Sequence, residues 1–561
     1  MKKLLSLTIL VSIVCLCSCK NDKVNTTKPT TTQTAVQQKA PFVWEAANVY
    51  FLLPDRFNNG DKSNDVTLNR THETGTARGF EGGDIKGITQ KIKDGYFTNL
   101  GINVIWLAPV FEQIHGGTDE STGFTYGFHG YWTKDWTKID PNFGTYEDLK
   151  ELVTTAHQNN IRILLDAVIN HTGPVTEKDP VWPKEWVRTE PQCVYKDYET
   201  TVACTLVRNL PDIITESDDV VELPIQLTEK WKKEGRLIKE KEELEAFFSA
   251  TGYPKAPRFY IMKWLADYVA ELGIDGYRVD TVKHVEESVW QEFRVICDNA
   301  YENFKKQNPD NTLQDNFYLI GEVYGYGIST GTSYNFSDKK VNYFDKSFNS
   351  LINFDFKWNA KEWKTYEQLF SFYSDKLQGE MNGYSILNYI SSHDDGQPFD
   401  LNRERTFEGG TKLLLTPGIS QIYYGDEIAR TLKIEGAHGD ANLRSFMNWN
   451  TVNNPKETKL LTHFQKLGKF RSEHAAIGAG VHKKISDSPY TFQRTFTKNS
   501  YTDKVVVALN VMKGKKEIEV ASVFKNGAKV KDAYSNTIGE VSEGKIIINS
   551  PFDIVLLEEI N

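Results

Sequence analysis

The feature that most constrains the fold is a regular alternation of short apolar segments with amphipathic helical ones. The apolar segments number eight, at residues 48–53, 102–109, 161–168, 273–280, 317–323, 351–356, 384–392 and 419–425. Strands that are apolar throughout and separated by helices are typical of a parallel sheet covered on its faces. Eight such units predict an α/β fold with a (β/α)₈ TIM barrel, whose active site lies at the carboxyl ends of the strands.

Two stretches do not fit this alternation. Residues 172–258, after the third strand, contain a cysteine pair, a section rich in Trp and Tyr, and a charged helical part at 227–248. From residue 478 onward, short strands broken by turns predict a C-terminal antiparallel β-sandwich. The sequence therefore predicts a barrel of residues 41–171 and 259–477, an inserted domain of residues 172–258, and a sandwich domain of residues 478–561.

The N-terminus has the pattern of an export signal. Lys2 and Lys3 precede an apolar run over residues 4–16, which is too short to span a bilayer permanently. Cys19 then resembles the lipidated cysteine of a bacterial lipobox, and the alternative is an ordinary cleaved signal peptide. We expect a signal peptide at 1–19 and a flexible tether at 20–40, rich in Thr, Gln and Lys. The chain is thus expected to be exported and lipid-anchored to a bacterial membrane, on the periplasmic side or at the cell surface.

The cysteines are few and unevenly placed. Cys15 and Cys17 leave with the signal and Cys19 is assigned to the lipid, so Cys193 and Cys204 remain as a close pair. An exported protein permits a disulfide between them, and the alternative is two unpaired thiols. The net charge of −9 and the lack of a basic run argue against a nucleic-acid partner.

An acidic residue stands at the end of the fourth predicted strand. Arg278 precedes Asp280 by two positions and lies on the same face, because side chains alternate along a strand. A guanidinium close to a carboxylate lowers its pKa and keeps it ionised, which suits a nucleophile. A structural arginine–aspartate pair explains the same two residues equally well, so this stretch alone leaves both interpretations open.

Polar residues also follow other predicted strands. They are Asp166, Asn170 and His171 at and beyond the end of the third strand, Glu322 near the end of the fifth, and His393 and Asp394 after the seventh. Buried charges are unfavourable unless they are paired or used. Glycoside hydrolysis needs two carboxyl groups that face each other across such a site. One attacks the anomeric carbon, and the other, with a raised pKa, protonates the leaving oxygen.

Several motifs stand in the order of the signature regions of the α-amylase superfamily, glycoside hydrolase family 13. Four resemble its main regions: Asp166-Ala-Val-Ile-Asn170-His171, Gly276-Tyr-Arg278-Val-Asp280-Thr-Val-Lys283-His284, Gly321-Glu322-Val323 and Ser392-His393-Asp394. Residues 209–213 and 416–427 resemble two further regions, and residues 126–132 resemble the segment that supplies a sugar-stacking tyrosine. The resemblance covers roughly residues 45–560.

The resemblance implies a role for each of these residues. Asp280 is the expected nucleophile, Glu322 the general acid/base, and Asp394 the residue that stabilises the transition state. In a retaining enzyme the first two carboxyl groups lie about 5–5.5 Å apart. The residues expected to bind the sugar or brace the site are Tyr131, His129, Asp166, His171, Arg278, Lys283, His284 and His393.

Two calcium sites are also implied. The first would use Asn170, Asp212 and the backbone carbonyl of His284. A second, oxygen-rich site is similar to one in relatives that act on cyclodextrin and pullulan, and its alternative is a solvated turn. Its candidate residues are Asn59, Asp61, Asn64, Asp65, Gly82 and Asp84.

The expected activity is that of a retaining, endo-acting α-1,4-glucan hydrolase of the α-amylase type, acting on starch or maltodextrin as a monomer. Two features depart from the family pattern. Asp395 follows Asp394 where many relatives carry an amide or a hydroxyl, and the long charged segment 212–260 is similar to the periplasmic α-amylase branch. A cyclomaltodextrinase, neopullulanase or transglycosylase of the same family is an alternative. A non-catalytic glycan-binding lipoprotein is an alternative of another class.

Overall fold

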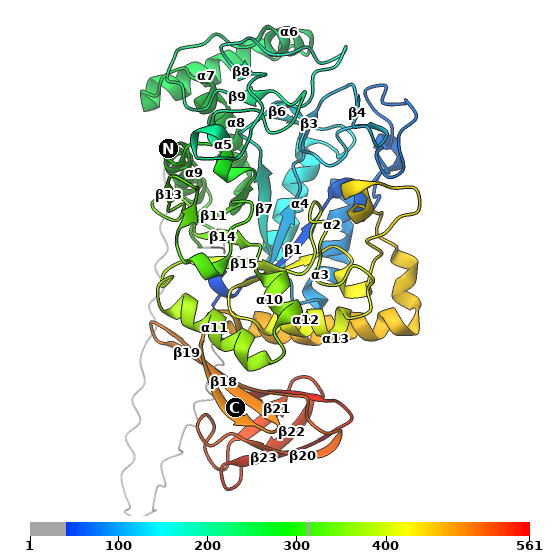
Figure 1. Cartoon of the computed structure of the whole chain (residues 1–561), viewed down its shortest axis with the longest axis vertical. Coiled ribbons are helices and arrows are strands. Elements are labelled where there is room, and N and C mark those ends of the chain that lie inside the picture. The colour runs from blue at the N-terminus through cyan, green and yellow to red at the C-terminus, as the bar shows by residue number, and fades with distance from the viewer. Residues whose placement is uncertain (1–40, 311–312, 314, 561) are drawn as a thin grey trace, which may run out of the picture. The chain divides into compact units, whose positions relative to one another are not determined.

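The computed structural model describes residues 41–310, 313 and 315–560 (Figure 1). The expected signal peptide with Cys19 and the expected tether lie outside these described residues. Within the described part of the chain, no helix is both long enough and apolar enough to cross a membrane.

A closed barrel of parallel strands forms the centre of the chain. Each predicted apolar segment contributes one strand, and the strands are β1 (Asn48–Leu52), β2 (Val104–Leu107), β7 (Arg162–Ala167), β10 (Gly276–Val279), β11 (Tyr318–Gly321), β14 (Ser350–Asn353), β15 (Ser385–Tyr389) and β16 (Ile419–Tyr423). They pair in this order, and β16 pairs with β1 to close the barrel. Every strand residue is buried, as expected where side chains fill the barrel on one face and meet helices on the other. The predicted barrel is confirmed.

Helices cover the barrel from outside because one face of each is apolar. In α4 (Tyr146–Gln158), the buried Leu149, Leu152 and Val153 recur at helical spacing, and Thr145 and Asp148 cap the first turn reciprocally. The other barrel helices include α2 (Ile85–Lys93), α3 (Tyr96–Asn99), α8 (Pro257–Leu272), α9 (Glu287–Gln307), α10 (Phe356–Glu362), α11 (Tyr366–Gln378), α12 (Thr406–Leu415) and α13 (Pro455–Glu473).

The backbone after Asp280 differs from a direct strand-to-helix transition. A 3-10 turn, η3 (Val282–His284), follows, and α9 begins only at Glu287. Thr281 has a left-handed φ of 50°, and its N–H donates to Glu322 Oε2 at 3.0 Å. The N–H of Val282 donates to the Glu322 carbonyl at 3.0 Å. The left-handed backbone at Thr281 interrupts the path from strand to helix, and the two N–H groups hold the end of the neighbouring strand in place.

The charged part of the inserted segment forms two helices where the sequence predicts one helical part. The whole segment contains β8 (Val187–Arg188), α5 (Glu199–Val202), β9 (Asp212–Ile213), α6 (Ile225–Lys233) and α7 (Leu237–Thr251). The last two helices separate at Gly235, whose φ of 75° ends a helix without strain. Lys230 and Arg236 pair with the buried Asp135 of β6 (Thr133–Ile139), at 2.9 and 2.6 Å. These two charged residues therefore attach α6 and the start of α7 to β6.

The C-terminal domain consists of two antiparallel sheets. The larger has the order β17 (Val481–Asp487), β18 (Tyr490–Lys498), β19 (Tyr501–Leu509), β24 (Ile554–Glu559), β21 (Lys529–Asp532) and β22 (Thr537–Glu540), and the smaller pairs β20 (Gly514–Glu519) with β23 (Lys545–Ser550). Val506 and Leu557 of the larger sheet share one apolar core with Ile518 and Ile548 of the smaller. Two sheets that enclose a common core form a sandwich, as predicted.

His474 links the last barrel helix to the C-terminal domain. It follows α13, and its ring nitrogens lie 2.8 Å from Asp503 of β19 and 2.9 Å from Glu558 of β24. Burial alone lowers the pKa of His474, but hydrogen bonds to these two carboxylates raise it to about 9. The charged imidazolium therefore stabilises the contact between α13 and the two strands.

His474→Gln is expected to lower the free energy of unfolding by about 2 kcal/mol at pH 6. The folded-state pKa of about 9 exceeds the ordinary value of 6.5. The stabilisation is therefore fully present below pH 6.5 and is lost as the pH rises through 9. Thermal unfolding between pH 6 and pH 10 should give a Tm difference that disappears near pH 10. His438→Gln, at an exposed histidine, is the control, and an equal Tm difference at both ends of the range would contradict the assignment.

Candidate active site

Strand register brings the acidic residues together at the carboxyl end of the barrel. Arg278 of β10 lies beside Asp166 of β7, and Val279 lies beside Gly321 of β11. Asp280 and Glu322 each follow one of these paired residues, so they stand at adjacent strand ends. They therefore come from neighbouring strands and do not face each other from opposite sides of the barrel mouth.

One buried guanidinium contacts three carboxylates. Arg278 Nη1 lies 2.8 Å from Asp166 Oδ1 and 2.8 Å from Asp280 Oδ1, while Nη2 lies 2.9 Å from Glu322 Oε1. Burial by itself lowers the pKa of Arg278, but the surrounding carboxylates raise it well above its ordinary value. The arginine therefore stays charged, and it cannot neutralise all three acids at once. At least one of them gains from holding a proton.

The environment of Glu322 makes it the carboxyl group of this cluster best suited to hold and donate a proton. Burial raises its pKa, Arg278 opposes the increase, and the charges of Asp280 and Asp394 add to it. Burial also raises the pKa of Asp166. Its carboxylate, however, accepts hydrogen bonds from Tyr131 Oη at 3.0 Å, Trp106 Nε1 at 3.2 Å and Arg278. Such donors favour the charged form, so Asp166 is suited to bracing and Glu322 to giving up a proton.

Asp394 lies on the loop after β15. Its side chain is 36% exposed, and Ser392 Oγ donates to its Oδ1 at 3.3 Å. Desolvation raises the pKa of Asp394, Arg278 and Arg444 lower it, and Asp395 raises it. Arg444 was not among the sequence candidates. Its Nε donates to the His393 carbonyl at 3.0 Å, across 51 residues of chain, and no motif marks it.

Three histidines and a tyrosine line the same region. The Tyr131 ring is stacked on His393 with centroids 5.1 Å apart and lies 5.8 Å from His129, and His171 Nε2 lies 3.2 Å from the Tyr131 carbonyl. Burial lowers the pKa of His129, His171 and His393, so all three are neutral at pH 7. A neutral imidazole has one donor and one acceptor nitrogen, which suits contacts with hydroxyl groups.

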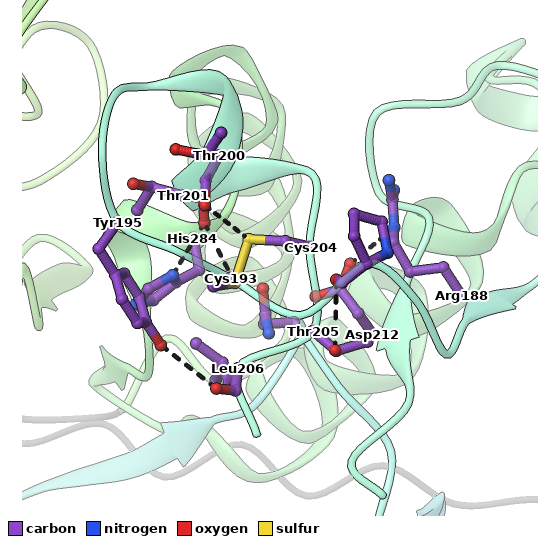
Figure 2. Close-up of a disulfide and its surroundings, with 12 residues drawn as sticks. Arg188, Cys193, Tyr195, Thr200, Thr201, Cys204, Thr205, Leu206, Asp212 and His284 are labelled. Carbon is purple, nitrogen blue, oxygen red and sulfur yellow. Dashed lines mark hydrogen bonds and ion pairs between the residues drawn. A yellow bond between two sulfur atoms is a disulfide. The ribbon is translucent and has the colours of Figure 1, made fainter. Parts of the chain in front are cut away.

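Lys283 and His284 lie on η3, and both already have partners in the protein. Lys283 Nζ donates to the Tyr324 carbonyl at 3.0 Å, and burial lowers its pKa while Glu322 raises it. His284 Nδ1 lies 3.0 Å from the Thr201 carbonyl, in a loop closed by the Cys193–Cys204 disulfide (Figure 2). The inserted segment therefore orients a residue only four positions after Asp280.

The first expected calcium site contains oxygens that need a partner. Asn170 Oδ1 and Asp212 Oδ1 are buried and have no hydrogen-bond partner among the described residues, and Asp212 Oδ2 pairs with Arg188 Nε at 2.9 Å (Figure 2). Burial raises the pKa of Asp212 well above its ordinary value, and Arg188 opposes this. A cation that prefers oxygen ligands fits these atoms. The described residues contain no group of three or more His, Cys, Asp or Glu side chains able to hold a metal, so amide and carbonyl oxygens would have to complete the site.

The second expected site is only partly assembled. Asn59 Oδ1 and Asn64 Oδ1 are buried without a partner among the described residues, and Asn59 Nδ2 donates to Asp65 Oδ1 at 2.8 Å. A Cβ at Gly82 would lie 2.7 and 2.8 Å from those Asn59 and Asp65 atoms, so only glycine fits there. The remaining carboxylates are engaged elsewhere, Asp61 with Ser63 and Lys86, and Asp84 with the backbone N–H groups of Gly60, Asp61 and Gly87.

A closed parallel barrel with carboxyl groups gathered around one arginine at its strand ends defines an enzyme of the barrel glycosidase class. Residues 51–471 match the family described as the catalytic domain of alpha-amylase. The chain therefore belongs to the alpha-amylase family, as its motifs predict.

Individual proteins that are similar to this chain include alpha-amylases and a cyclomaltodextrin glucanotransferase. The chain is 35% identical over 509 residues to a periplasmic alpha-amylase of Escherichia coli (strain K12), an alignment that covers 79% of this chain and 69% of the relative. It is 26% identical over 462 residues to a cyclomaltodextrin glucanotransferase of Thermoanaerobacterium thermosulfurigenes, covering 80% of this chain and 58% of that protein. The solved alpha-amylase of Anoxybacillus matches with a TM-score of 0.64 at 24% identity, over 93% of this chain and 100% of the other, which shows the fold alone.

Proposed function

We propose that the protein is a retaining, endo-acting hydrolase of α-1,4-glucans such as starch and maltodextrin. The observation that carries the proposal is the contact of Asp280 and Glu322 with opposite nitrogens of one guanidinium. It sets two carboxyl groups side by side on one cation, and burial raises the pKa of one of them, Glu322. A retaining pair about 5–5.5 Å apart requires this combination of nucleophile and acid.

The proposed reaction has two steps. In the first, an Asp280 oxygen attacks the anomeric carbon, the bond from that carbon to the glycosidic oxygen breaks, and Glu322 gives its proton to the departing oxygen. In the second, the Glu322 carboxylate takes a proton from water while the water oxygen attacks the anomeric carbon and releases Asp280. Asp394 stabilises the positive charge of both transition states.

We assign sugar contacts to the residues around this pair. Tyr131 would lie beneath the reacting sugar, and the neutral imidazoles beside it would exchange hydrogen bonds with hydroxyl groups. The full set comprises Tyr131, His129, Asp166, His171, Arg278, Lys283, His284 and His393.

We also propose the domain boundaries expected from the sequence, with the inserted domain at 172–258 and the sandwich beginning at 478. The structure supports them in that β7 ends at Ala167, α8 begins at Pro257 and β17 begins at Val481.

Export and lipid anchoring through Cys19 are proposed from the signal pattern, and the similarity to a periplasmic alpha-amylase supports export. We propose a monomer.

Release of reducing sugar from soluble starch tests the proposed function. An endo-acting enzyme should abolish iodine staining before many reducing ends have formed. The wild-type chain should show this behaviour, and Asp280→Asn should not. A chain that binds starch and releases no sugar would support the non-catalytic glycan-binding alternative.

Transfer of the glycosyl unit to a second sugar is the other candidate, because the chain is similar to a glucanotransferase. The covalent intermediate of the proposed mechanism would react at its anomeric carbon either with water or with a sugar hydroxyl. Product analysis on starch, pullulan and cyclodextrin with added maltose distinguishes them. Products longer than the substrate would indicate transfer.

Calcium at the site of Asn170 and Asp212 would neutralise a buried carboxylate and hold the insert against the end of β7. Removing calcium with a chelator is therefore expected to lower Tm by about 2–4 °C, and adding the ion back should restore it. Asp212→Asn should lose this response, while Asp219→Asn, at an exposed aspartate of the same segment, should keep it. A full calcium response in Asp212→Asn, measured by unfolding and by calorimetric titration of the ion, would reject the site.

A further inference from the structure

The aspartate that departs from the family pattern, Asp395, is held by the protein through both carboxylate oxygens. Its Oδ2 accepts from Lys357 Nζ and from Tyr389 Oη, the latter at 2.6 Å, and its Oδ1 accepts from the Gln397 N–H at 3.0 Å. Its side chain is only 10% exposed. Asp395 is therefore fixed between the end of β15, which carries Tyr389, and α10, which carries Lys357.

Lys357 is buried and, among the described residues, forms an ion pair with one carboxylate. It lies in the first turn of α10, its side chain is 7% exposed, and Asp395 is the acid with which it forms an ion pair. Its Nζ also lies 5.1 Å from the Trp358 ring centroid and 6.0 Å from that of Tyr389. Removing one partner from a buried ion pair leaves the other charge uncompensated, which is strongly unfavourable. The lysine and the aspartate therefore act as one unit.

Asp394, by contrast, has little support of its own. Among the described residues, Ser392 Oγ is the one hydrogen-bond donor to its side chain, at 3.3 Å. His393, the residue before it, is held by Arg444, which donates a hydrogen bond to the His393 carbonyl, and by the Tyr131 ring, which stacks on the imidazole. The residue after it is held by the Lys357 pair. The loop is thus anchored on both sides of Asp394. Because His393 and Asp395 are fixed, the backbone at Asp394 is fixed as well, and this limits the positions that its side chain can take.

The charges around these two aspartates are unequal. Arg278, Arg444 and Asp395 act on Asp394, and His393 Nδ1 lies 3.6 Å from its Oδ1. The charge of Asp394 in turn raises the pKa of Glu322, Tyr131, Tyr324 and Tyr389. Lys357 and Tyr389 contact Asp395, which also raises the pKa of Tyr324. Without the lysine, a second full negative charge would stand next to Asp394 and disfavour its ionised form. Lys357 offsets that charge through its contact with Asp395 Oδ2.

Building on the proposed function, we propose that Lys357 acts through Asp395 as a positioning residue for Asp394, and that it neutralises the additional carboxylate which this chain carries beside its reacting centre. Both effects support the transition state more than the bound substrate. They should therefore appear in kcat and in the pH profile more than in KM.

Lys357→Met tests the proposal. The acid limb of the kcat/KM profile on maltooligosaccharides should move up by about half a pH unit, because Asp395 then stands uncompensated beside Asp394. The kcat at the optimum should fall about tenfold, with KM changed less than about twofold. Lys357→Arg, which keeps the charge, should retain the wild-type acid limb. The double variant Lys357→Met/Asp395→Asn removes both charges and should return the limb to its wild-type position.

The outcomes separate this proposal from the proposed function. If wild-type turnover is abolished by Asp280→Asn but Lys357→Met keeps the wild-type acid limb, the inference is wrong, even if Tm falls. If Lys357→Met does not fold, Asp395→Asn decides, because the freed lysine should move the acid limb down, and an unmoved limb overturns the inference. If the wild-type chain has no glycosidase activity, the proposed function fails and this inference falls with it.

Discussion

Asp280→Asn is expected to remove nearly all turnover of α-1,4-glucans, by about 10⁴-fold or more, while glucan binding is kept. An amide cannot form the covalent bond to the anomeric carbon, so the first step of the proposed reaction is lost. The amide oxygen can still accept the hydrogen bond that Arg278 donates at 2.8 Å, so the site should keep its shape. Single-turnover kinetics on maltooligosaccharides and calorimetric binding would measure the two effects separately.

Asp298→Asn is the matched control, because Asp298 lies on α9 with its side chain 43% exposed and pairs with Arg294 four residues earlier. It should keep wild-type turnover. Undiminished activity of Asp280→Asn would reject the nucleophile assignment. Loss of binding together with turnover would show that Asp280 serves the structure of the site, which is the interpretation that its sequence stretch alone leaves open.

Glu322→Gln should lower turnover of starch about 10³-fold, because the leaving oxygen no longer receives a proton. A maltosyl substrate whose leaving group departs as a stable anion needs no protonation, so its first step should be much less affected. The pH profile should change as well. Glu322 must hold its proton to act, so activity falls as the pH rises through its pKa. Since burial raises that pKa, the wild-type alkaline limb should lie above the ordinary range of a glutamate and should disappear in the variant.

Glu302→Gln, at an exposed glutamate of α9, controls for the loss of one carboxylate. It should keep both limbs of the profile. If Glu322→Gln loses the activated substrate as severely as starch, or keeps the alkaline limb, Glu322 is not the general acid.

Much of the fold could be predicted because its signals are local. A strand buried on both faces needs a continuous apolar segment, and seven of the eight barrel strands lie wholly within such segments, while β14 begins one residue earlier, at Ser350. The candidate acids lie at or just beyond the carboxyl ends of those segments, so their position at one end of the barrel follows from strand direction. The division of the charged part of the insert into two helices could not be predicted in the same way. Gly235 interrupts this charged stretch, and the polarity of the residues does not change there.

The metal candidates show where a local pattern is insufficient. Alternating oxygen-bearing residues predict a cation site, but Asp61 and Asp84 are engaged with Lys86 and with backbone N–H groups. Whether a carboxylate is free for a ligand depends on donors from other segments, and composition does not report them.

The sequence by itself determined the barrel, the sandwich, the family motifs and which acids end each strand, because each of these depends on residues close together in the chain. Only the tertiary structure decided that Asp280 and Glu322 share Arg278 from adjacent strands, since this depends on the register of β7, β10 and β11. It also decided that Arg444 holds His393 from 51 residues away and that Lys357 holds Asp395 from 38 residues away, on the two sides of Asp394. Packing alone brings such distant charges within hydrogen-bonding distance, and burial then makes those contacts strong enough to set the chemistry of the site.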